Sequence, residues 1–334
     1  RLDPELTIDR MFELPAGRMF SISGTASVQP AASDATISKL LGIGGSSAGQ
    51  ITRSSSSSRL VGSLTNGPWA AFDGNKATSW MPGFQTGPNT WLEGATKNSM
   101  TISRANITFV NDGMHMVPTR LLITADGGSG GSYSFDTHMK VATDAKRGAT
   151  QTLNVSFPSM TGRTFRLTVD RFQAVEVKDR ISGARNHPPI AITELNFGVI
   201  KPEVFSPRFK TACRNDLISI DGNGVPVRVE SSTTDALMQR QIAFTSCGEK
   251  FSLSAGTHHL RTAFGVSTGI NIDNISLASL MQSSASPVTP IENLKSHWTN
   301  RWTLEAQIPA GAAGQYVAVG QSFGPGWTAK LDGV

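Results

Sequence analysis

Turn-forming residues interrupt this chain so often that a long helix has almost no room to form. The 334 residues include Gly 33 and Pro 17, with Ser and Thr abundant between them. Between the turns, short runs alternate apolar and polar side chains, which is the pattern of half-buried strands. In the run 163–172, Phe165, Leu167 and Val169 fall on one face, and the polar side chains fall on the other. Other strand-like runs cover 18–29, 100–109, 120–125, 150–157, 190–199, 225–230, 241–244, 250–253, 258–263, 302–308 and 315–321.

Only two segments have helical character, one near 34–41 with Asp34 as its expected cap and one near 235–239. Many short strands with so few helices favour β-sandwiches. We therefore expect an all-β protein made of tandem jelly-roll sandwiches.

The charge pattern argues against a nucleic-acid partner. The formal net charge is +5, from Lys+Arg 30 and Asp+Glu 25, but the basic residues are scattered. Proteins that track phosphates cluster these residues on one face or in one run. No apolar run approaches the ~18–20 residues that a membrane span needs. The chain begins at Arg1 and stops abruptly at Val334, so we expect it to be a piece of a longer protein.

Proline and serine-rich stretches suggest where the domains divide. Lys201-Pro202 and Ser206-Pro207 interrupt the strand pattern, because proline disfavours a continuing strand. This predicts a first domain over 1–200 and a second over 201–334, and it leaves open a third sandwich that starts after 290. Within the first domain, 42–59 is low in complexity and reads as a mobile, Ser-rich insertion. A Ser/Pro linker is expected at 283–290.

Cys213 and Cys247 are the two cysteines of the chain, and both lie in its second half. In a reducing cytosol they would be free thiols, whereas in an exported protein they would pair. The exported-looking composition favours the disulfide.

The most informative segment runs from Trp69 to Trp80. Asp73-Gly74-Asn75 reads as a tight turn, in which glycine supplies a positive φ and the polar side chains bond to backbone amides. The carboxylate, amide and hydroxyl oxygens gathered there could also hold a hard cation such as Ca²⁺. In the simpler interpretation Asp73 only caps its own turn.

This segment resembles the discoidin, or coagulation factor 5/8 type C, family, which includes galactose-binding-like carbohydrate-binding modules. Ala70, Asp73, Gly74, Thr78 and Trp80 match the family pattern. The resemblance continues in order through later strands and covers roughly residues 20–200. Those further matches are at Trp91-Leu92, 118–123, 163–167 and 191–195.

The resemblance implies a structural Ca²⁺ and a sugar site. Carried over residue by residue, the metal ligands are Asp73, Asn75, Thr78 and Glu194. Sugars would bind at loops 81–90, 111–117 and 172–188, because an aromatic platform and hydrogen-bonding side chains are needed there. The candidates are Phe84, His115, Arg171, Asn186 and His187.

Structural interpretations compete with these roles. Phe84 would only pack its loop, and His115 and His187 would only be exposed to solvent. Trp80 and Trp91 match core positions of the family, so we expect them to be buried.

The order of the whole chain, with a discoidin-like module, a disulfide-bearing sandwich and a closing Pro325-Gly326-Trp327 segment, resembles the periplasmic region of mycobacterial α-(1→3)-arabinofuranosyltransferases. The resemblance implies a non-catalytic region that holds arabinan-type cell-wall glycan, in arabinogalactan or lipoarabinomannan, near a membrane-embedded catalytic domain of the same chain. Such a region would lie on the periplasmic face of the plasma membrane. Two alternatives stay open: an accessory region of a secreted glycoside hydrolase, and a packing module that binds no sugar.

Enzyme motifs give little support to catalysis in this piece. Gly127-Gly128-Ser129-Gly130-Gly131 matches the G-x-S-x-G spacing, but strand-like residues follow it where a nucleophile elbow needs a helix. His258-His259 would point to opposite faces of a strand, so this pair is interpreted as structural. A glycosidase pair of carboxylates stays open at this point.

Overall fold

The computed structural model describes residues 7–45, 47, 49–84, 87–179, 181–202, 205–248, 250–279, 294–300, 302–309 and 328–332. The chain divides into two compact units, Arg1–Ala278 and Ser279–Val334. The first unit contains two separate hydrophobic cores, each between layers of antiparallel strands. The expected all-β architecture is confirmed. No helix in the described part of the chain is long and apolar enough to cross a bilayer.

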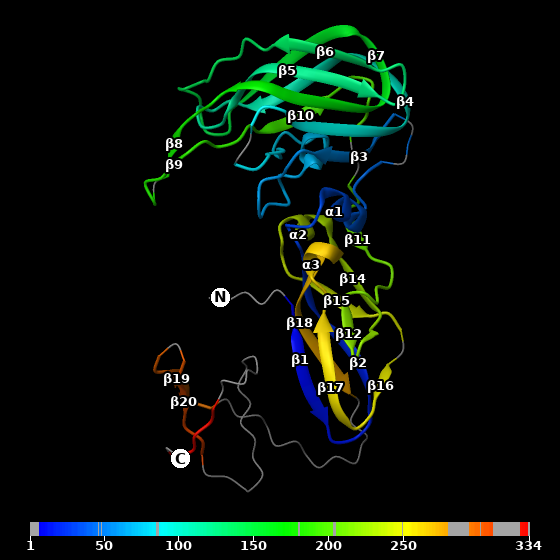
Figure 1. Ribbon diagram of the computed structural model, residues 1–334, viewed down its shortest axis with the longest axis vertical. Coiled ribbons are helices and arrows are strands. Elements are labelled where there is room, and N and C mark those ends of the chain that lie inside the picture. The colour runs from blue at the N-terminus through cyan, green and yellow to red at the C-terminus, as the bar shows by residue number, and fades with distance from the viewer. Residues whose placement is uncertain are drawn as a thin grey trace. The chain divides into compact units, whose positions relative to one another are not determined.

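The first sandwich is built around two long strands that belong to both of its layers (Figure 1). In the first layer, the first half of β4 pairs with β3 on one side and with the second half of β7 on the other. This half of β7 also pairs with β5, which pairs with β6, so the order is β3-β4-β7-β5-β6. The other halves of β4 and β7 form the second layer with β10. The bounds are β3 Ile51–Ser56, β4 Thr90–Val110, β5 Val117–Asp126, β6 Gly131–Asp136, β7 Thr150–Gln173 and β10 Ile192–Asn196.

The change of layer occurs where the strands' register breaks. The pairing of β4 with β7 shifts between Ala95 and Met100 and again between Ile102 and Arg104. Close by, a Cβ on Gly162 would lie 2.6 Å from the carbonyl oxygen of Asp126. Only glycine allows this close approach of strands at the bend. The strands expected separately at 150–157 and 163–172 form one continuous strand, β7.

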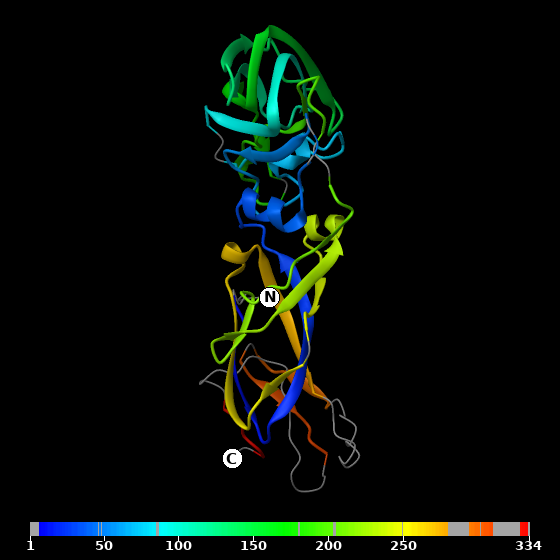
Figure 2. The ribbon, with the colours of Figure 1, turned by 90° about the vertical axis from the view of Figure 1, so that its right-hand side faces the viewer.

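The second sandwich takes strands from both ends of the first unit (Figure 2). One sheet has the order β1-β17-β12-β13, and the other has β11-β14-β15-β2-β16, with β18 also paired to β2. The bounds are β1 Asp9–Leu14, β2 Arg18–Val28, β11 Arg208–Lys210, β12 Ile218–Ile220, β13 Asn223–Gly224, β14 Val227–Ser232, β15 Ile242–Ser246, β16 Phe251–Leu253, β17 Gly256–Thr262 and β18 Ile270–Ser279.

This pairing differs from the division at residue 200 that the sequence suggested. Strand β2 pairs with β15 through Ala26 and Ile242, and β1 pairs with β17 through Asp9 and Arg261. The first sandwich is therefore inserted between strands of the second. Local turn signals mark where strands end, but they contain no information about which distant strand pairs with which.

The helices are short, as expected. They are α1 Asp34–Leu41, α2 Thr233–Leu237, α3 Gly265–Thr268 and the 3₁₀ turn η1 Pro68–Ala71. The cap of α1 is Ser33, whose hydroxyl accepts from the amide of Thr36, so the assignment of Asp34 as the cap was wrong by one residue. Asp34 instead pairs with Arg59 and accepts from Ser56.

The segment 42–59 is not the mobile loop that its composition suggested. It contains β3, which pairs with β4 from Ile51 to Ser56. The side chains of Ile51 and Ser54 are buried. A partner strand supplies the backbone hydrogen bonds that compensate for the ordering of these small residues.

Two small hairpins complete the described chain. One is formed by β8 Val177–Lys178 and β9 Arg185–Asn186, in the first unit. The other is formed by β19 Ser296–Trp298 and β20 Leu304–Ala306, in the second unit. The predicted linker at 283–290, the predicted strand at 315–321 and the segment 325–327 lie outside the described residues.

The predicted disulfide is confirmed between Cys213 and Cys247, whose Cα atoms are 5.7 Å apart. It closes a sequence separation of 34 residues. Backbone bonds beside it, from Cys247 to Pro226 and from Arg214 to Val227, place it next to the start of β14. The bridge thus ties the chain before β12 to the end of β15.

We predict that replacing both cysteines, in the double variant C213S/C247S, lowers the free energy of unfolding by about 3–4 kcal/mol, because the open chain gains entropy when unfolded. Urea denaturation of both proteins measures the difference. Dithiothreitol should destabilise the wild type and leave the double variant unchanged. Equal stability of the two proteins would contradict the prediction.

His258 holds the turn at Asp221, and its neighbour His259 does not share this environment. The Nδ1 of His258 donates to Oδ2 of Asp221 at 2.6 Å, and the Nε2 of His258 donates to the carbonyl oxygen of Ser254 at 3.0 Å. His258 is buried, whereas His259 is only partly buried, with its side chain 43% exposed, as expected for adjacent residues of a strand. The Asp221 carboxylate, followed by the Ser254 carbonyl, raises the pKa of His258 above its ordinary 6.5, because both acceptors favour the doubly protonated ring.

A raised pKa in the folded state means that His258 stabilises the fold fully below pH 6.5, and that this contribution is lost as the pH rises through the folded pKa. We therefore expect the stability difference between wild type and H258Q to shrink between pH 6 and pH 9. Thermal denaturation across this range measures it. H187Q, at an exposed histidine, serves as the control and should follow the wild type. A difference that grows with pH would refute the assignment.

Candidate functional site

The turn predicted at 73–78 forms directly after η1 and is rich in oxygen atoms. Gly74 has φ +73°, the left-handed region that glycine favours. Asp73 Oδ1 accepts from the amide of Asn75 at 2.8 Å, and Asp73 Oδ2 accepts from the hydroxyl of Thr78 at 2.7 Å. The carbonyl oxygens of Asn75 and Ala70 also lie within 2.7 Å and 3.4 Å of that hydroxyl. One hydroxyl hydrogen therefore faces three acceptors.

Glu194, on β10, completes this cluster from the other end of the domain sequence. The amide of Gly74 donates to its carboxylate, and its Oε2 is buried without a hydrogen-bond partner among the described residues. Burial, followed by the nearby Asp73 carboxylate, raises the pKa of Glu194 to about 7, although Lys76 and the Gly74 amide act in the opposite direction. Burial also raises the pKa of Asp73. Lys76 offsets part of this effect on Glu194, but neither carboxylate forms an ion pair among the described residues.

The residues fit a hard cation. An unpartnered buried carboxylate oxygen, a second carboxylate, a hydroxyl and two carbonyl oxygens make an all-oxygen donor set, which Ca²⁺ prefers. Asn75 could contribute its carbonyl oxygen, which lies 2.7 Å from the Thr78 hydroxyl, or its side-chain oxygen, which accepts from the amide of Ala77 at 3.1 Å. The described residues contain no cluster of three or more His, Cys, Asp or Glu side chains that could hold a metal. Hydroxyl and carbonyl groups would therefore have to supply the other ligands.

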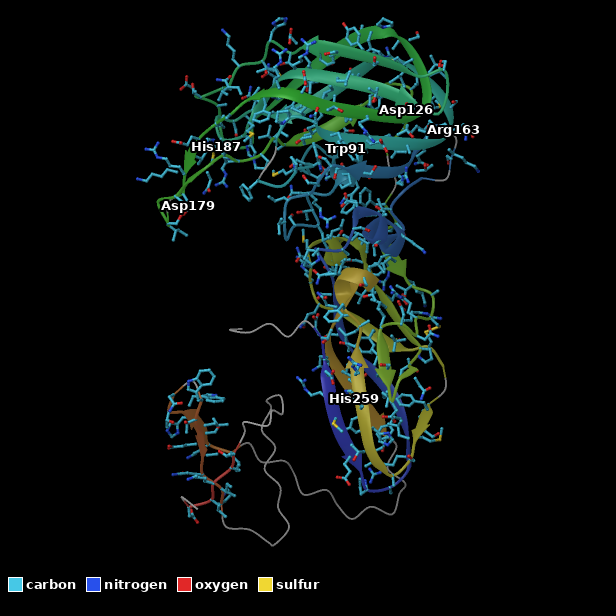
Figure 3. All side chains as sticks on the ribbon, in the orientation of Figure 1. Trp91, Asp126, Arg163, Asp179, His187 and His259 are labelled. Atoms are coloured by element: carbon cyan, nitrogen blue, oxygen red, sulfur yellow. A yellow bond between two sulfur atoms is a disulfide. The ribbon has the colours of Figure 1, made fainter. Side chains whose placement is uncertain are left out.

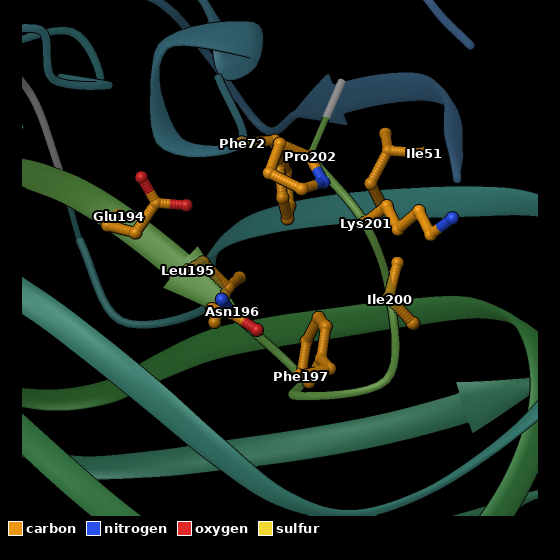
Figure 4. A pocket seen from close by; sticks show the side chains of 9 residues that line it. All are labelled: Ile51, Phe72, Glu194, Leu195, Asn196, Phe197, Ile200, Lys201 and Pro202. Carbon is orange, nitrogen blue, oxygen red and sulfur yellow. The ribbon is translucent and has the colours of Figure 1, made fainter. Parts of the chain in front are cut away.

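A small hollow lies beside Glu194 (Figure 4). In this view the Glu194 carboxylate points away from Leu195 and Phe197. Most of the lining is apolar and belongs to the edge of the core, and it offers none of the side chains predicted to contact sugar. The lining residues are Ile51, Phe72, Glu194, Leu195, Asn196, Phe197, Ile200, Lys201 and Pro202.

The predicted sugar-binding residues come from loops at one end of the first sandwich. The start of β5 pairs with the end of β7 through Val117 and Gln173, and the start of β4 pairs nearby through Thr90 and Val169. The amide of Met116 donates to the carbonyl oxygen of Pro188 at 3.3 Å, which adds the segment after β9 to the same end. Figure 3 shows His187 at this end and Arg163 at the opposite one.

The candidates differ in how freely they could meet a ligand. Phe84 is 59% exposed, and the Arg171 side chain is 69% exposed, with Asp170 at 4.0 Å. Asn186 is exposed on β9. The exposed His187 is 3.1 Å from the Val175 carbonyl through Nδ1. These four side chains can reach solvent.

His115 instead holds its own loop in place. Its Nδ1 bonds to Oδ1 of the buried Asp112 at 2.9 Å. Burial acts to raise the pKa of Asp112, but the amides of Gly148 and Met114 together with His115 outweigh it, and the pKa is lowered. This network gives His115 a structural role in its loop, which differs from both expectations for it, sugar binding and simple exposure to solvent.

Trp91 differs from its expected place in the core. Trp80 is fully buried, as expected, but Trp91 is only half-buried, on the outer face of β4. The guanidinium of Arg166 stacks over its ring, 4.1 Å from the centroid. The alternation in 163–172 already placed Arg166 outward, but no local signal indicated that Trp91 would lie beneath it.

Comparison with known proteins gives similarity in structure only. No protein-family profile and no curated protein sequence matches the chain. The structure of the arabinofuranosyltransferase AftD from Mycobacteria aligns with 87% of this chain at 14% identity, with a TM-score of 0.57. The chain shares the fold of one region of AftD. A mutant form of AftD aligns over the same 87% at 13% identity, with a TM-score of 0.58. The chain spans about a fifth of the length of AftD, 21–22%.

A pectin-binding carbohydrate-binding module is also similar to part of the chain. It aligns over 45% of this chain and 91% of its own length, at 14% identity, with a TM-score of 0.30.

Proposed function

We propose that this chain is a non-catalytic carbohydrate-binding region of a membrane arabinofuranosyltransferase. The fold shared with AftD over 87% of the chain is the observation that supports this proposal most directly. The ligand would be an arabinan-type glycan of the bacterial cell wall, and the catalytic domain would be a membrane-embedded part of the same protein. The region would then lie at the periplasmic face of the plasma membrane.

The physical advantage of such a region is effective concentration. A glycan bound to a domain tethered beside an active site meets that site at a far higher local concentration than free glycan does. No chemistry is needed in the binding domain itself. Phe84, Arg171, Asn186 and His187 would supply the aromatic contact and the hydrogen-bonding groups, because sugars present apolar C–H faces and hydroxyl edges.

Calorimetry with arabinan oligosaccharides tests the proposal, with galactan and mannan as comparison ligands. We expect saturable binding to arabinan, weakened about tenfold by F84A, because truncating an aromatic anchor typically costs more than 1 kcal/mol. F264A is the matched control, since Phe264 is 60% exposed and lies in the second sandwich. R171A and R208A form a second pair, with side chains 69% and 72% exposed. Absence of heat with every glycan would favour a packing module.

We further propose that Ca²⁺ binds through Asp73, Asn75, Thr78 and Glu194. The buried Oε2 of Glu194 supports this, since an ion there would contact a carboxylate oxygen that otherwise has no hydrogen-bond partner among the described residues. The ion would join the Asp73 turn to β10.

If Ca²⁺ binds, EDTA should lower the melting temperature of the wild type, because a ligand at 100 times its Kd stabilises the folded state by about 2.7 kcal/mol. The E194Q variant should lose this response. E176Q, at an exposed glutamate paired with Arg185, should keep it. Scanning calorimetry with CaCl₂ and with EDTA makes the measurement, and an unchanged wild-type transition would refute the ion.

A further inference from the structure

The outer face of the five-stranded layer of the first sandwich has a regular cross-strand arrangement of polar side chains. The inward positions of these strands belong to the core, including Leu92, Phe165, Leu167, Leu121 and Ile123. The side chains between them in sequence therefore point outward. Strand pairing aligns these outward residues into two rows. The first row is Ser55, Glu93, Arg166, Thr124 and Ser132, and the second is Ser57, Trp91, Thr168, Leu122 and Ser134.

An ion pair stacked on an aromatic ring lies at the centre of this face. Arg166 donates to Glu93 Oε2 through Nε at 2.9 Å and through Nη2 at 2.7 Å. The same guanidinium lies over the ring of Trp91, and Ser55 donates to the other oxygen of Glu93 at 3.3 Å. The Arg166 side chain is still 41% exposed. Its Nη1 group has no acceptor among the described residues, so it presents two N–H donors outward.

The charges of this face are largely neutralised within it. Glu93 pairs with Arg166, and Arg120 lies 3.3 Å from Asp170 and 3.4 Å from Asp136. Arg53, which lies opposite Ala95, is the outward cation without an ion-pair partner among the described residues. A polyanion needs a field of uncompensated positive charge, whereas rows of hydroxyls, a fixed guanidinium and one apolar side chain, Leu122, suit an uncharged polyhydroxylated ligand.

We propose that this face is a second carbohydrate-binding surface, which binds an uncharged glycan chain running across the five strands in the order β3-β4-β7-β5-β6. Arg166 is the central donor, and Trp91 and Glu93 hold its guanidinium flat and fixed. Neighbouring strands lie about 4.8 Å apart, so the five strands span about 19 Å, the length of several linked sugar rings. In Figure 3, Trp91 lies between the end that carries His187 and the end that carries Arg163. The surface is therefore distinct from the loop residues at the His187 end.

This inference rests on the proposed carbohydrate-binding function, so the experiment separates the two. Native gels containing arabinogalactan, or polygalacturonate as an acidic comparison, report binding as retardation. The variants are the loop double F84A/H187A, the face variants R166M and T124Y, and F84A/H187A combined with R166M. T124Y places a bulky, strand-compatible side chain opposite Arg166 without removing the ion pair. R163M is the matched control, an exposed arginine of the same strand at the other end. Melting temperatures establish that each variant is folded.

We expect R166M and T124Y to weaken retardation by arabinogalactan about tenfold or more. R166M removes the charged hydrogen bonds from Arg166 to the glycan, and T124Y places a bulky side chain beside this donor. R163M should match the wild type. The loop double should retain part of the binding, and adding R166M should remove the remainder. If folded R166M and T124Y bind like the wild type while the loop double binds nothing, the face is not a binding surface. Retardation by polygalacturonate alone, lost in R166M, would overturn the uncharged ligand. A wild type that no glycan retards would refute the proposed function itself.

Discussion

Consecutive residues of one 3₁₀ turn are buried in two different hydrophobic cores. Trp69 and Ala70 of η1 belong to the core of the second sandwich, while Ala71 and the next residue, Phe72, belong to the core of the first. The turn cannot unwind without exposing large side chains in both places, and burying each such aromatic group contributes roughly 1.5–3 kcal/mol. Because the Asp73 turn follows without an intervening residue, the position of the candidate cation site depends on this anchor. Arg59, which stacks near Trp69 and pairs with Asp34, connects the same turn to the start of α1.

The sequence was sufficient for those features that depend on local chemistry. Alternation predicted the strands around Phe165 and their inward faces, the Asp73-Gly74-Asn75 turn formed as its residue types indicate, and the opposite environments of His258 and His259 follow from strand geometry. Free thiols and a disulfide were both open for the two cysteines, and composition favoured the disulfide, which the structure confirms. The pairing of strands that are distant in sequence was not predicted. The assignment of β1 and β2 to the first sandwich was wrong because β-strand partners are selected by packing across the whole fold.

The candidate site divides in the same way. The end loops could be located from the order of the strands, but the environment of each side chain could not. His115 became part of a hydrogen-bonded loop through Asp112. Trp91 lies outside the core because it is adjacent to the buried Leu92 in β4 and therefore points to the opposite face of the sheet. On that face Arg166 of β7 covers its ring. Both outcomes depend on a neighbour that is distant in sequence or unmarked by any motif.

The insertion of one sandwich between the strands of another sets an order of events during biosynthesis. Ser27 of β2 contacts Asp273, 246 residues later, so the second sandwich stays incomplete until β18 has left the ribosome or the export channel. The inserted sandwich has all its strands by Asn196 and can close first. Meanwhile β2 is an unpaired strand with one exposed apolar face, the kind of segment that aggregates or recruits chaperones. Fragments that end near residue 200 would keep β2 permanently in that state, whereas fragments that begin after β2 and end before β11 would not carry it.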